Sequence, residues 1–318
     1  MKVILIGHTI GIKRCFEALT ESKHEIVAVF THERKLHEPD LQLFDIRKEH
    51  FMDYSWDVFN TESEFQAPLF EYVSLDDSIT IDLLAKLQAD ALVTVGCRDI
   101  LKSSLIEKFK FAINLHPFNL PFFRGAGIDS WMILMAAENQ KQQATCHFIA
   151  KGIDKGDIIC TAPYWIFPSD RPIDIFKRRI DLLGNLLLHA LNNLELPGFK
   201  PTQQDDSQSS YYPRLNTMRD GKIDFINWSG DEINRFIRAF SYPYHGAWAF
   251  YNDQQLHILD AVFTRVDYVH PFSYGLAFRK VDNELFVYVK NGIISITAIE
   301  FESKPLSISS IKLGRKFK

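Results

Sequence analysis

The stretch Ile113-Asn-Leu-His-Pro-Phe-Asn-Leu-Pro-Phe-Phe-Arg-Gly-Ala-Gly127 carries the strongest local signal in the sequence. It begins as an apolar strand and continues as a loop rich in proline and glycine. Asn114 and His116 are two residues apart on that strand, so both side chains point to the same side. Active sites of α/β domains form at the carboxyl end of such strands. The sequence therefore predicts an amide and an imidazole that converge at one edge of a sheet.

Short apolar runs of this kind recur along the first 200 or so residues, and segments with helix-period apolar stripes separate them. The runs show little polar alternation, as expected when helices cover both faces of a parallel sheet. The predicted strands are Val3–Ile6, Ile26–Phe30, Ala91–Val95, Ala112–Leu115, Cys146–Ile149 and Ile158–Thr161, and the predicted helices are Gly11–Leu19, Ile79–Gln88, Ile128–Ala137 and Ile173–Leu194. This alternation predicts a doubly wound, mostly parallel α/β domain over residues 1–205.

The segment 37–71 fits neither period and is rich in aromatic and acidic residues. We interpret it as a long excursion between strands, and loops of that length are usually functional or disordered. Its aromatic side chains Trp56, Phe59 and Phe65 could pack on the domain or stack on a base, and packing is the favoured interpretation for each.

A second, smaller domain is predicted over residues 206–318, after a polar stretch without periodicity. Ser229 and Glu232 form a capping-box pattern that predicts the start of a helix over Gly230–Phe240. Beyond that helix, apolar and polar residues alternate in runs separated by the turn signals Asn252-Asp253, Asp282-Asn283 and Asn291-Gly292. The pattern predicts a β-rich, barrel-like or curled sheet.

Composition and charge exclude several classes of protein. Of 318 residues, 46% are hydrophobic and 24% charged, which is typical of a globular protein. Residues 206–318 hold 14 Lys and Arg against 12 Asp and Glu, and by subtraction residues 1–205 hold 22 against 28, which is not the pattern of a nucleic-acid binder. No apolar run suits a signal peptide or a membrane span, so we expect a cytoplasmic protein without membrane contact. The four cysteines form no CxxC pair and HExxH is absent, so no metal site is predicted.

A carboxylate completes the predicted site. Gly152-Ile-Asp-Lys-Gly-Asp157 lies about forty residues after Asn114 and places Asp154 in a glycine-flanked turn before the next strand. Asn114 could donate to an oxyanion, His116 could accept a proton from an amine, and Asp154 could orient the imidazole, which together suit acyl transfer. Asp157 is the rival carboxylate, and spacing alone does not decide between the two. A GxSxG elbow is absent, and the spacing of Gly7 and Gly11 does not match a dinucleotide fingerprint.

The run Asn114-Leu-His-Pro117, together with Leu120-Pro-Phe-Phe-Arg-Gly125, Trp131 and Asp154-Lys-Gly-Asp157, resembles the folate-dependent formyltransferase family. That family includes methionyl-tRNA formyltransferase, glycinamide ribonucleotide formyltransferase and the sugar N-formyltransferases. The resemblance continues through Asp220-Gly-Lys-Ile-Asp224 and His245-Gly-Ala-Trp248, at the entry to the family's C-terminal barrel, so the matching blocks cover most of the chain.

The resemblance implies a Rossmann-like catalytic domain in which Asn114, His116 and Asp154 are the catalytic residues. It implies 10-formyltetrahydrofolate as co-substrate and no metal. Main-chain groups would hold the pterin ring, and they would come from Arg98, Ile100 and Leu101 after the central strand and from Ala150, Lys151, Gly152 and Ile153 before the catalytic Asp.

The resemblance is strongest to sugar N-formyltransferases, because the 37–71 excursion and the aromatic segment Ser241–His245 are similar to regions of those enzymes. The expected acceptor is a nucleotide-linked amino sugar, first dTDP-4-amino-4,6-dideoxyglucose, for O-antigen or surface polysaccharide biosynthesis. The next acceptors in order of expectation are the 3-amino isomers and GDP-perosamine. The residues expected to bind this substrate are Tyr242, Tyr244, His245 and Arg124. Two alternatives stay open, a methionyl-tRNA formyltransferase and a non-catalytic sugar-nucleotide-binding protein, and family analogy implies a possible homodimer.

Overall fold

The computed structural model describes residues 1–8, 10–54, 56–59, 65 and 67–318. Its contacts divide the chain into two compact units. Unit 1 contains Met1–Ala126, Lys141–Trp165 and Phe176–Tyr212, and unit 2 contains Gly127–Gln140, Ile166–Ile175 and Pro213–Lys318. Positions 9, 55, 60–64 and 66, most of them in the 37–71 excursion, lie outside the described residues. The predicted domain division after residue 205 and the predicted homodimer stay predictions.

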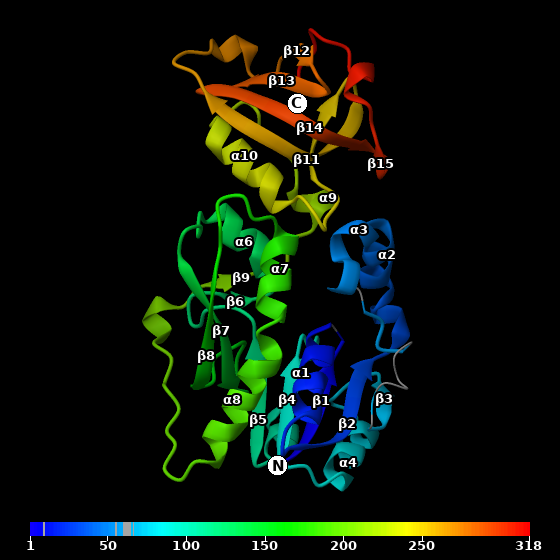
Figure 1. The fold of residues 1–318 in the computed structure, drawn as a ribbon, viewed down its shortest axis with the longest axis vertical. Helices are drawn as coiled ribbons and strands as arrows, with labels where there is room; N and C mark the ends of the chain where they lie inside the picture. The colour runs from blue at the N-terminus through cyan, green and yellow to red at the C-terminus, as the bar shows by residue number, and fades with distance from the viewer. Residues whose placement is uncertain (9, 55, 60–64, 66) are drawn as a thin grey trace. The chain divides into compact units, whose positions relative to one another are not determined.

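Within the described residues, unit 1 contains a seven-stranded sheet with the order β3-β2-β1-β4-β5-β7-β8 (Figure 1). The strands are β1 (Lys2–Gly7), β2 (Glu25–His32), β3 (Leu69–Tyr72), β4 (Ala91–Val95), β5 (Phe111–His116), β7 (Lys141–Phe148) and β8 (Ile158–Trp165). The strands from β3 to β5 in this order pair in parallel, whereas β7 and β8 pair antiparallel. The doubly wound, mostly parallel sheet predicted from the sequence is confirmed.

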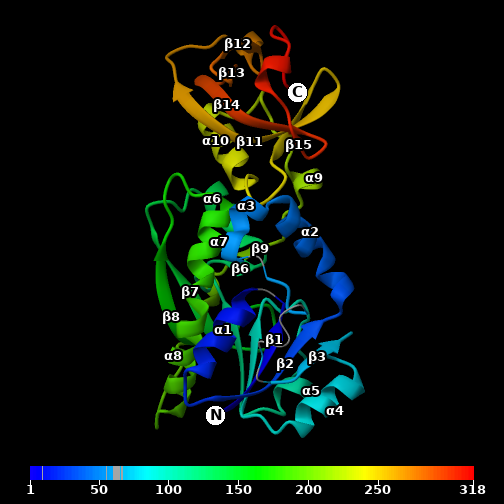
Figure 2. The ribbon, with the colours of Figure 1, turned by 45° about the vertical axis from the view of Figure 1, so that its right-hand side comes forward.

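Both faces of this sheet are buried, which explains the continuous apolar runs. Val3 and Leu5 of β1 belong to one core cluster, and Ile4 and Ile6 belong to another. Alternate residues of a strand point to opposite faces, so the two clusters lie on opposite sides of the sheet. The first is completed by α1 (Ile10–Thr20) and α8 (Leu183–Glu195), which lie side by side in Figures 1 and 2, and the second by α4 (Ser78–Lys86) and α5 (Ser103–Ile106).

The prediction of one helix over Ile173–Leu194 was wrong. The structure has α7 (Pro172–Ile180) and then α8, with a turn at Asp181 between them. The Asp181 carboxylate accepts a hydrogen bond from Tyr54 and lies 3.3 Å from the Arg14 guanidinium. Aspartate is a poor helix former, and these contacts from distant segments hold it at a break that the apolar stripe does not reveal.

The 37–71 excursion contains regular structure that the sequence reading missed. Here the chain forms α2 (Glu38–Ile46), α3 (Lys48–Phe51) and β3, and Figure 2 shows the two helices after β2. The apolar residues of α2 do not line one face, and none of its residues is buried, so this helix carries no continuous apolar stripe. Trp56 and Phe65 are buried with their ring centroids 5.9 Å apart, in agreement with the packing interpretation.

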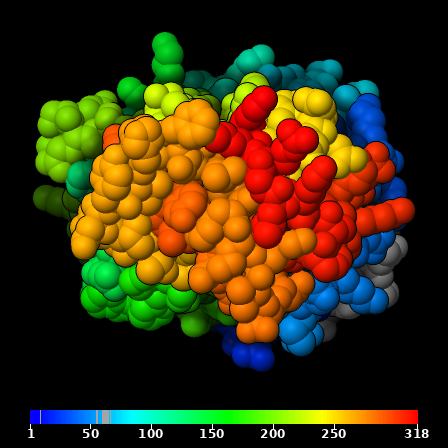
Figure 3. Space-filling view, turned by 90° about the horizontal axis from the view of Figure 1, so that it is seen from above, coloured from blue at the N-terminus to red at the C-terminus, as the bar shows by residue number. Residues whose placement is uncertain are grey.

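Unit 2 contains an antiparallel sheet, six-stranded in the described residues, with the order β10-β11-β14-β13-β12 and with β15 on β14. The strands are β10 (Ala247–Tyr251), β11 (Gln254–Arg265), β12 (Ala277–Val281), β13 (Glu284–Val289), β14 (Gly292–Phe301) and β15 (Lys304–Pro305). The predicted turn residues Asn252, Asp253, Asp282, Asn283 and Asn291 all have positive φ angles, as tight hairpins require. Orange and red residues from these strands and from the C-terminus gather on the face shown in Figure 3.

The helix α10 (Gly230–Ala239) packs against β11 of this sheet. The Ser229 side chain accepts from the Glu232 amide, and the Glu232 carboxylate accepts from the Ser229 amide, so the predicted capping box is confirmed. Two shorter helices, α6 (Ile128–Leu134) and α9 (Thr217–Asp220), belong to the same unit. Within the described residues, no helix is both long and apolar enough to cross a membrane.

Candidate active site

β5 presents the predicted amide and imidazole on one face. Ile113 and Leu115 point into the core cluster with α1 and α8, so Asn114 and His116 point to the other side of the strand. β7 pairs antiparallel with β5 and places His147 opposite Asn114. The carboxyl end of β5 therefore gathers side chains from two strands.

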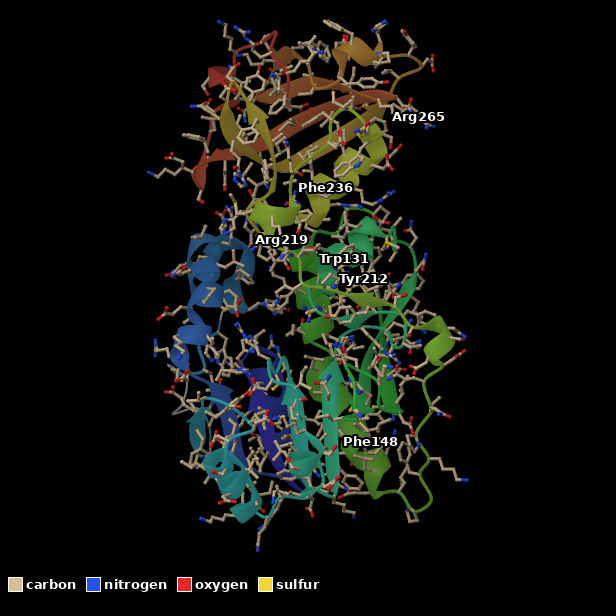
Figure 4. The ribbon with its side chains drawn as sticks, turned by 180° about the vertical axis from the view of Figure 1, so that it is seen from behind. Trp131, Phe148, Tyr212, Arg219, Phe236 and Arg265 are labelled. Atoms are coloured by element: carbon tan, nitrogen blue, oxygen red, sulfur yellow. The ribbon has the colours of Figure 1, made fainter. Side chains whose placement is uncertain are left out.

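The Asn114 amide is held in one orientation. Its Oδ1 accepts a hydrogen bond of 2.8 Å from the Thr94 hydroxyl, and its Nδ2 lies 3.0 Å from His147 Nε2. His147 Nδ1 donates to the Phe148 carbonyl at 2.8 Å, so in the neutral ring Nε2 accepts from Asn114. Figure 4 labels Phe148, the last residue of β7. An amide carries two hydrogens, and the bond to His147 occupies one, so the other can be donated to an oxyanion.

His116 is buried and its tautomer follows from its contacts. Nε2 lies 2.6 Å from the Phe123 carbonyl oxygen, which can only accept, so Nε2 carries the hydrogen. Nδ1 then carries the lone pair of the neutral ring, and it faces Asp154 Oδ2 at 3.7 Å. Burial lowers the pKa of His116 below its ordinary value, and the Asp154 charge offsets part of that effect. The site thus holds a neutral imidazole beside a carboxylate that stabilises its protonated form.

Asp154 lies in the turn between β7 and β8 in a left-handed conformation, with φ of 51°. Its Oδ2 accepts from the Gly125 amide at 3.0 Å, and its Oδ1 lies 3.6 Å from His147 Nε2. Burial by itself raises the pKa of Asp154, but His116, His147 and the Gly125 amide outweigh it and lower that pKa to about 2. The turn needs glycine at position 156, because a Cβ there would lie 1.8 Å from the Phe148 carbonyl oxygen.

The structure distinguishes the two rival carboxylates. It places the Asp154 carboxylate beside both His116 and His147. The Asp157 carbonyl accepts from the Phe148 amide as part of the backbone pairing. Over the described residues, no contact of the Asp157 carboxylate with either imidazole is found. The geometry therefore favours Asp154, and its catalytic role stays a prediction.

His147 is the site residue that sequence reasoning missed. It is buried, and its Nε2 lies 3.0 Å from Asn114 Nδ2 and 3.6 Å from Asp154 Oδ1. The signal that could have found it is the pairing of β7 with β5, since an antiparallel neighbour places one residue directly opposite Asn114. A strand register of this kind is not readable from one sequence.

The residues predicted to hold the pterin ring lie in two loops of unit 1. After β4, the Arg98 amide donates to His32 Nε2 at 3.2 Å, while Ile100 is 70% exposed and Leu101 is buried. Before Asp154, the residues Ala150, Lys151, Gly152 and Ile153 form an exposed stretch. Their roles in binding stay predictions.

Three histidines cluster beside the first of these loops, at the carboxyl ends of β1 and β2. The rings of His8, His32 and His37 have centroids 5.5 to 6.4 Å apart. Burial, with smaller contributions from His8 and Arg98, lowers the pKa of His32 to about 3, and burial also lowers the pKa of His37. The Arg98 guanidinium donates to Asp40 at 2.8 Å. Burial therefore favours the neutral form of the His32 and His37 rings, which lie close to this ion pair. In the described part of the chain, no group of three or more His, Cys, Asp or Glu side chains could hold a metal ion.

The residues predicted to bind the acceptor are divided between the units. Tyr242, Tyr244 and His245 belong to unit 2, where the Arg171 guanidinium lies over the Tyr242 ring at 5.4 Å. Arg124 belongs to unit 1 and is buried, with its guanidinium bonded to Gln204 and Asp206. The substrate contacts of all four residues stay predictions.

Comparison with protein families gives two matches along the chain. Residues 1–191 match the model of the formyl transferase family, and residues 217–316 match the model of the formyl transferase C-terminal domain. Among curated relatives, the methionyl-tRNA formyltransferase of Rickettsia canadensis is 27% identical over 99% of this chain and 97% of its own length. That of Alkaliphilus oremlandii is 28% identical over 96% of this chain and 93% of its own length.

Solved structures share the fold at lower identity. An N-formyltransferase from Helicobacter canadensis, in complex with folinic acid and dTDP-3-aminofucose, has a TM-score of 0.66 and 19% identity over 93% of this chain and 98% of its own. WlaRD, a sugar 3N-formyl transferase with dTDP and 5-N-formyl-THF, has a TM-score of 0.63 and 19% identity over 93% and 97%. HypX from Aquifex aeolicus, with tetrahydrofolic acid, has a TM-score of 0.59 and 18% identity over 96% of this chain, which spans 46% of the HypX chain.

Proposed function

Because this chain belongs to the formyltransferase family, we propose that it transfers the formyl group of 10-formyltetrahydrofolate to the amine of a nucleotide-linked amino sugar. The observation that carries the proposal is the gathering of Asn114, His116 and Asp154 at the carboxyl end of β5, with 3.7 Å between the imidazole and the carboxylate. dTDP-4-amino-4,6-dideoxyglucose is the first acceptor to test, in a pathway of surface polysaccharide synthesis.

In the proposed reaction, 10-formyltetrahydrofolate supplies an activated formyl carbon when it is bound. As the acceptor nitrogen bonds to that carbon, Asn114 Nδ2 donates to the oxygen that gains negative charge. His116 accepts the proton that the nitrogen gives up, and Asp154 stabilises the imidazolium. The imidazolium then returns the proton to the folate nitrogen as its bond to the formyl carbon breaks, so the enzyme ends in its starting state.

The choice of a sugar acceptor is supported by charge. Residues 1–205 hold 22 Lys and Arg against 28 Asp and Glu. A surface that binds the phosphates of a tRNA acceptor stem needs an excess of Lys and Arg over Asp and Glu, which this part of the chain lacks. The likeness over 93% of this chain to the Helicobacter canadensis structure with dTDP-3-aminofucose also supports a small amino-sugar acceptor.

Methionyl-tRNA is the second candidate acceptor. The observation in its favour is the 27% identity to the Rickettsia canadensis methionyl-tRNA formyltransferase along almost the full length of both chains. If tRNA is the acceptor, its binding should weaken steeply as salt rises, because phosphate contacts release counterions. Filter binding of methionyl-tRNA across a salt series measures this directly.

An acceptor assay tests the proposal. We expect release of tetrahydrofolate when the protein is mixed with 10-formyltetrahydrofolate and a dTDP-linked 4-amino or 3-amino sugar or GDP-perosamine. We expect none with dTDP-glucose, which has no amine and serves as the matched control. Formylation of methionyl-tRNA alone would reassign the acceptor. Binding of dTDP-sugars in calorimetry without transfer to any amine would instead indicate a non-catalytic binding protein.

The protonation of His116 gives a prediction that needs no substrate. A general base must be unprotonated, and burial holds the pKa of His116 below the ordinary histidine value of about 6.5. The ring should therefore be neutral at pH 6.5 and take up its proton only at lower pH. NMR titration of the histidine ring signals, with the His116 signal assigned from a His116→Asn spectrum, measures this. A midpoint above pH 7 would contradict the proposed environment of the base.

A further inference from the structure

A buried amide from outside the catalytic strands holds the backbone of the Asp154 turn. Gln204 follows α8 and the Pro201 segment, and its side chain is buried. Its Nε2 donates to the Asp154 carbonyl at 2.8 Å and to the Gly156 carbonyl at 2.7 Å. Both hydrogens of the amide are thus used on one turn, on either side of Lys155.

Arg124 determines which way the Gln204 amide faces. Its Nε and Nη2 lie 3.3 and 2.7 Å from Gln204 Oε1, and Nη2 also donates to Asp206 Oδ1 at 2.7 Å. A guanidinium can only donate hydrogen bonds, so the Gln204 amide must face it with the oxygen Oε1 and not with the nitrogen Nε2. The hydrogen bond to Arg124 lowers the pKa of Asp206, so a carboxylate neutralises the buried cation.

The same segment also holds the Asp154 carboxylate. Gly125, the residue after Arg124, donates its amide to Asp154 Oδ2 at 3.0 Å. Arg124 and Gly125 form β6, which pairs in parallel with β9 (Tyr211–Tyr212). Gln204 therefore holds the backbone of Asp154, and Gly125 holds its carboxylate. Arg124 connects the two, because it bonds to Gln204 and precedes Gly125 in the chain.

Asp154 needs such support because of its backbone. Its φ of 51° lies in the left-handed region, which non-glycine residues occupy at a cost and keep only where the surroundings hold them. Without the two bonds from Gln204, the turn could relax and move the carboxylate relative to His116. Even small displacements of a catalytic group have large effects on the reaction rate.

From these contacts we infer that Arg124 and Gln204 are positioning residues, which act through the Asp154 turn to place its carboxylate beside His116. The inference rests on the proposed function for its kinetic consequence. It assigns Arg124 a role within the protein, which differs from the substrate contact implied by the family resemblance.

The test uses the full chain with Gln204→Met, which is close in shape but cannot donate, and Arg124→Lys, which keeps the charge. For Gln204→Met we expect kcat to fall ~10- to 100-fold while both KM values change less than ~3-fold. The pKa of His116 in the NMR titration should fall below that of the wild type, because the displaced carboxylate no longer raises it. Arg124→Lys should show the same changes to a smaller degree. Gln208→Met is the matched control, since Gln208 is an exposed glutamine bonded to Asp205.

An unchanged pKa of His116 in both variants would overturn the inference, whether or not activity falls, since a loss of folded protein alone lowers activity without moving that midpoint. An unchanged kcat in Gln204→Met would also overturn it. If Gln204→Met does not fold, Arg124→Lys carries both measurements. If the wild type transfers no formyl group, the proposed function fails, and the titration still decides the positioning role.

Discussion

Replacement of His116 by Asn is expected to lower turnover by ~10²–10⁴-fold, the usual contribution of a general base. Asn can still fill part of the site and donate toward the Phe123 carbonyl, which His116 Nε2 contacts at 2.6 Å. It cannot accept a proton, so the acceptor amine would have to lose its proton to water. Single-turnover formation of the formylated product measures the effect on the chemical step.

The matched control for this variant is His189→Asn, because His189 lies on α8 and is exposed. It should retain the wild-type rate. Circular dichroism and the melting temperature should show that the His116→Asn protein is folded. A folded His116→Asn protein with a rate within ~3-fold of the wild type would exclude the general-base role, since that role contributes more.

Replacement of Asp154 by Asn is expected to cost ~10²-fold or more in kcat, because the charge that stabilises the His116 imidazolium is removed. The amide oxygen of Asn can still accept from Gly125, so the turn keeps one of its bonds. The pKa of His116 should fall, since the Asp154 charge is what offsets its burial. Steady-state kinetics with the acceptor found in the panel, together with the NMR titration, measure both effects.

Asp157→Asn is the matched control for Asp154→Asn. Asp157 lies in the same turn, three residues along, and its carbonyl rather than its carboxylate takes part in the pairing with Phe148. Its loss of charge should therefore leave kcat within ~3-fold of the wild type, within the range of ordinary surface changes. A larger loss for Asp157→Asn than for Asp154→Asn would move the carboxylate assignment.

The elements that could be predicted are those with a buried face. β1 and β4 are almost entirely apolar, and β5 is apolar apart from Asn114 and His116, because helices cover both sides of the sheet. The helix α10 begins at a capping box that four consecutive residues encode. The segment 37–71 could not be predicted in this way, because α2 buries none of its residues. The break at Asp181 depends on Arg14 and Tyr54, which are distant in sequence.

The residues of the candidate site also fall into those that local sequence patterns predict and those that they do not. The local period of a strand placed Asn114 and His116 on one face, and two glycines marked the Asp154 turn. His147 joins them only through the register of β7 on β5, and Gln204 only through a loop that returns some fifty residues later. Neither has a local pattern that distinguishes it from an ordinary polar residue.

By itself, the sequence determined the α/β class, the β-rich second part, and the strand that carries the amide and the imidazole. These follow from interactions between residues close together in the chain, where periodicity and turn chemistry act. Only the tertiary structure decided that Asp154 rather than Asp157 faces His116, which tautomer the imidazole adopts, and which amide holds the turn. Those outcomes depend on the directions of hydrogen bonds between distant segments, and such directions exist only once the chain has folded.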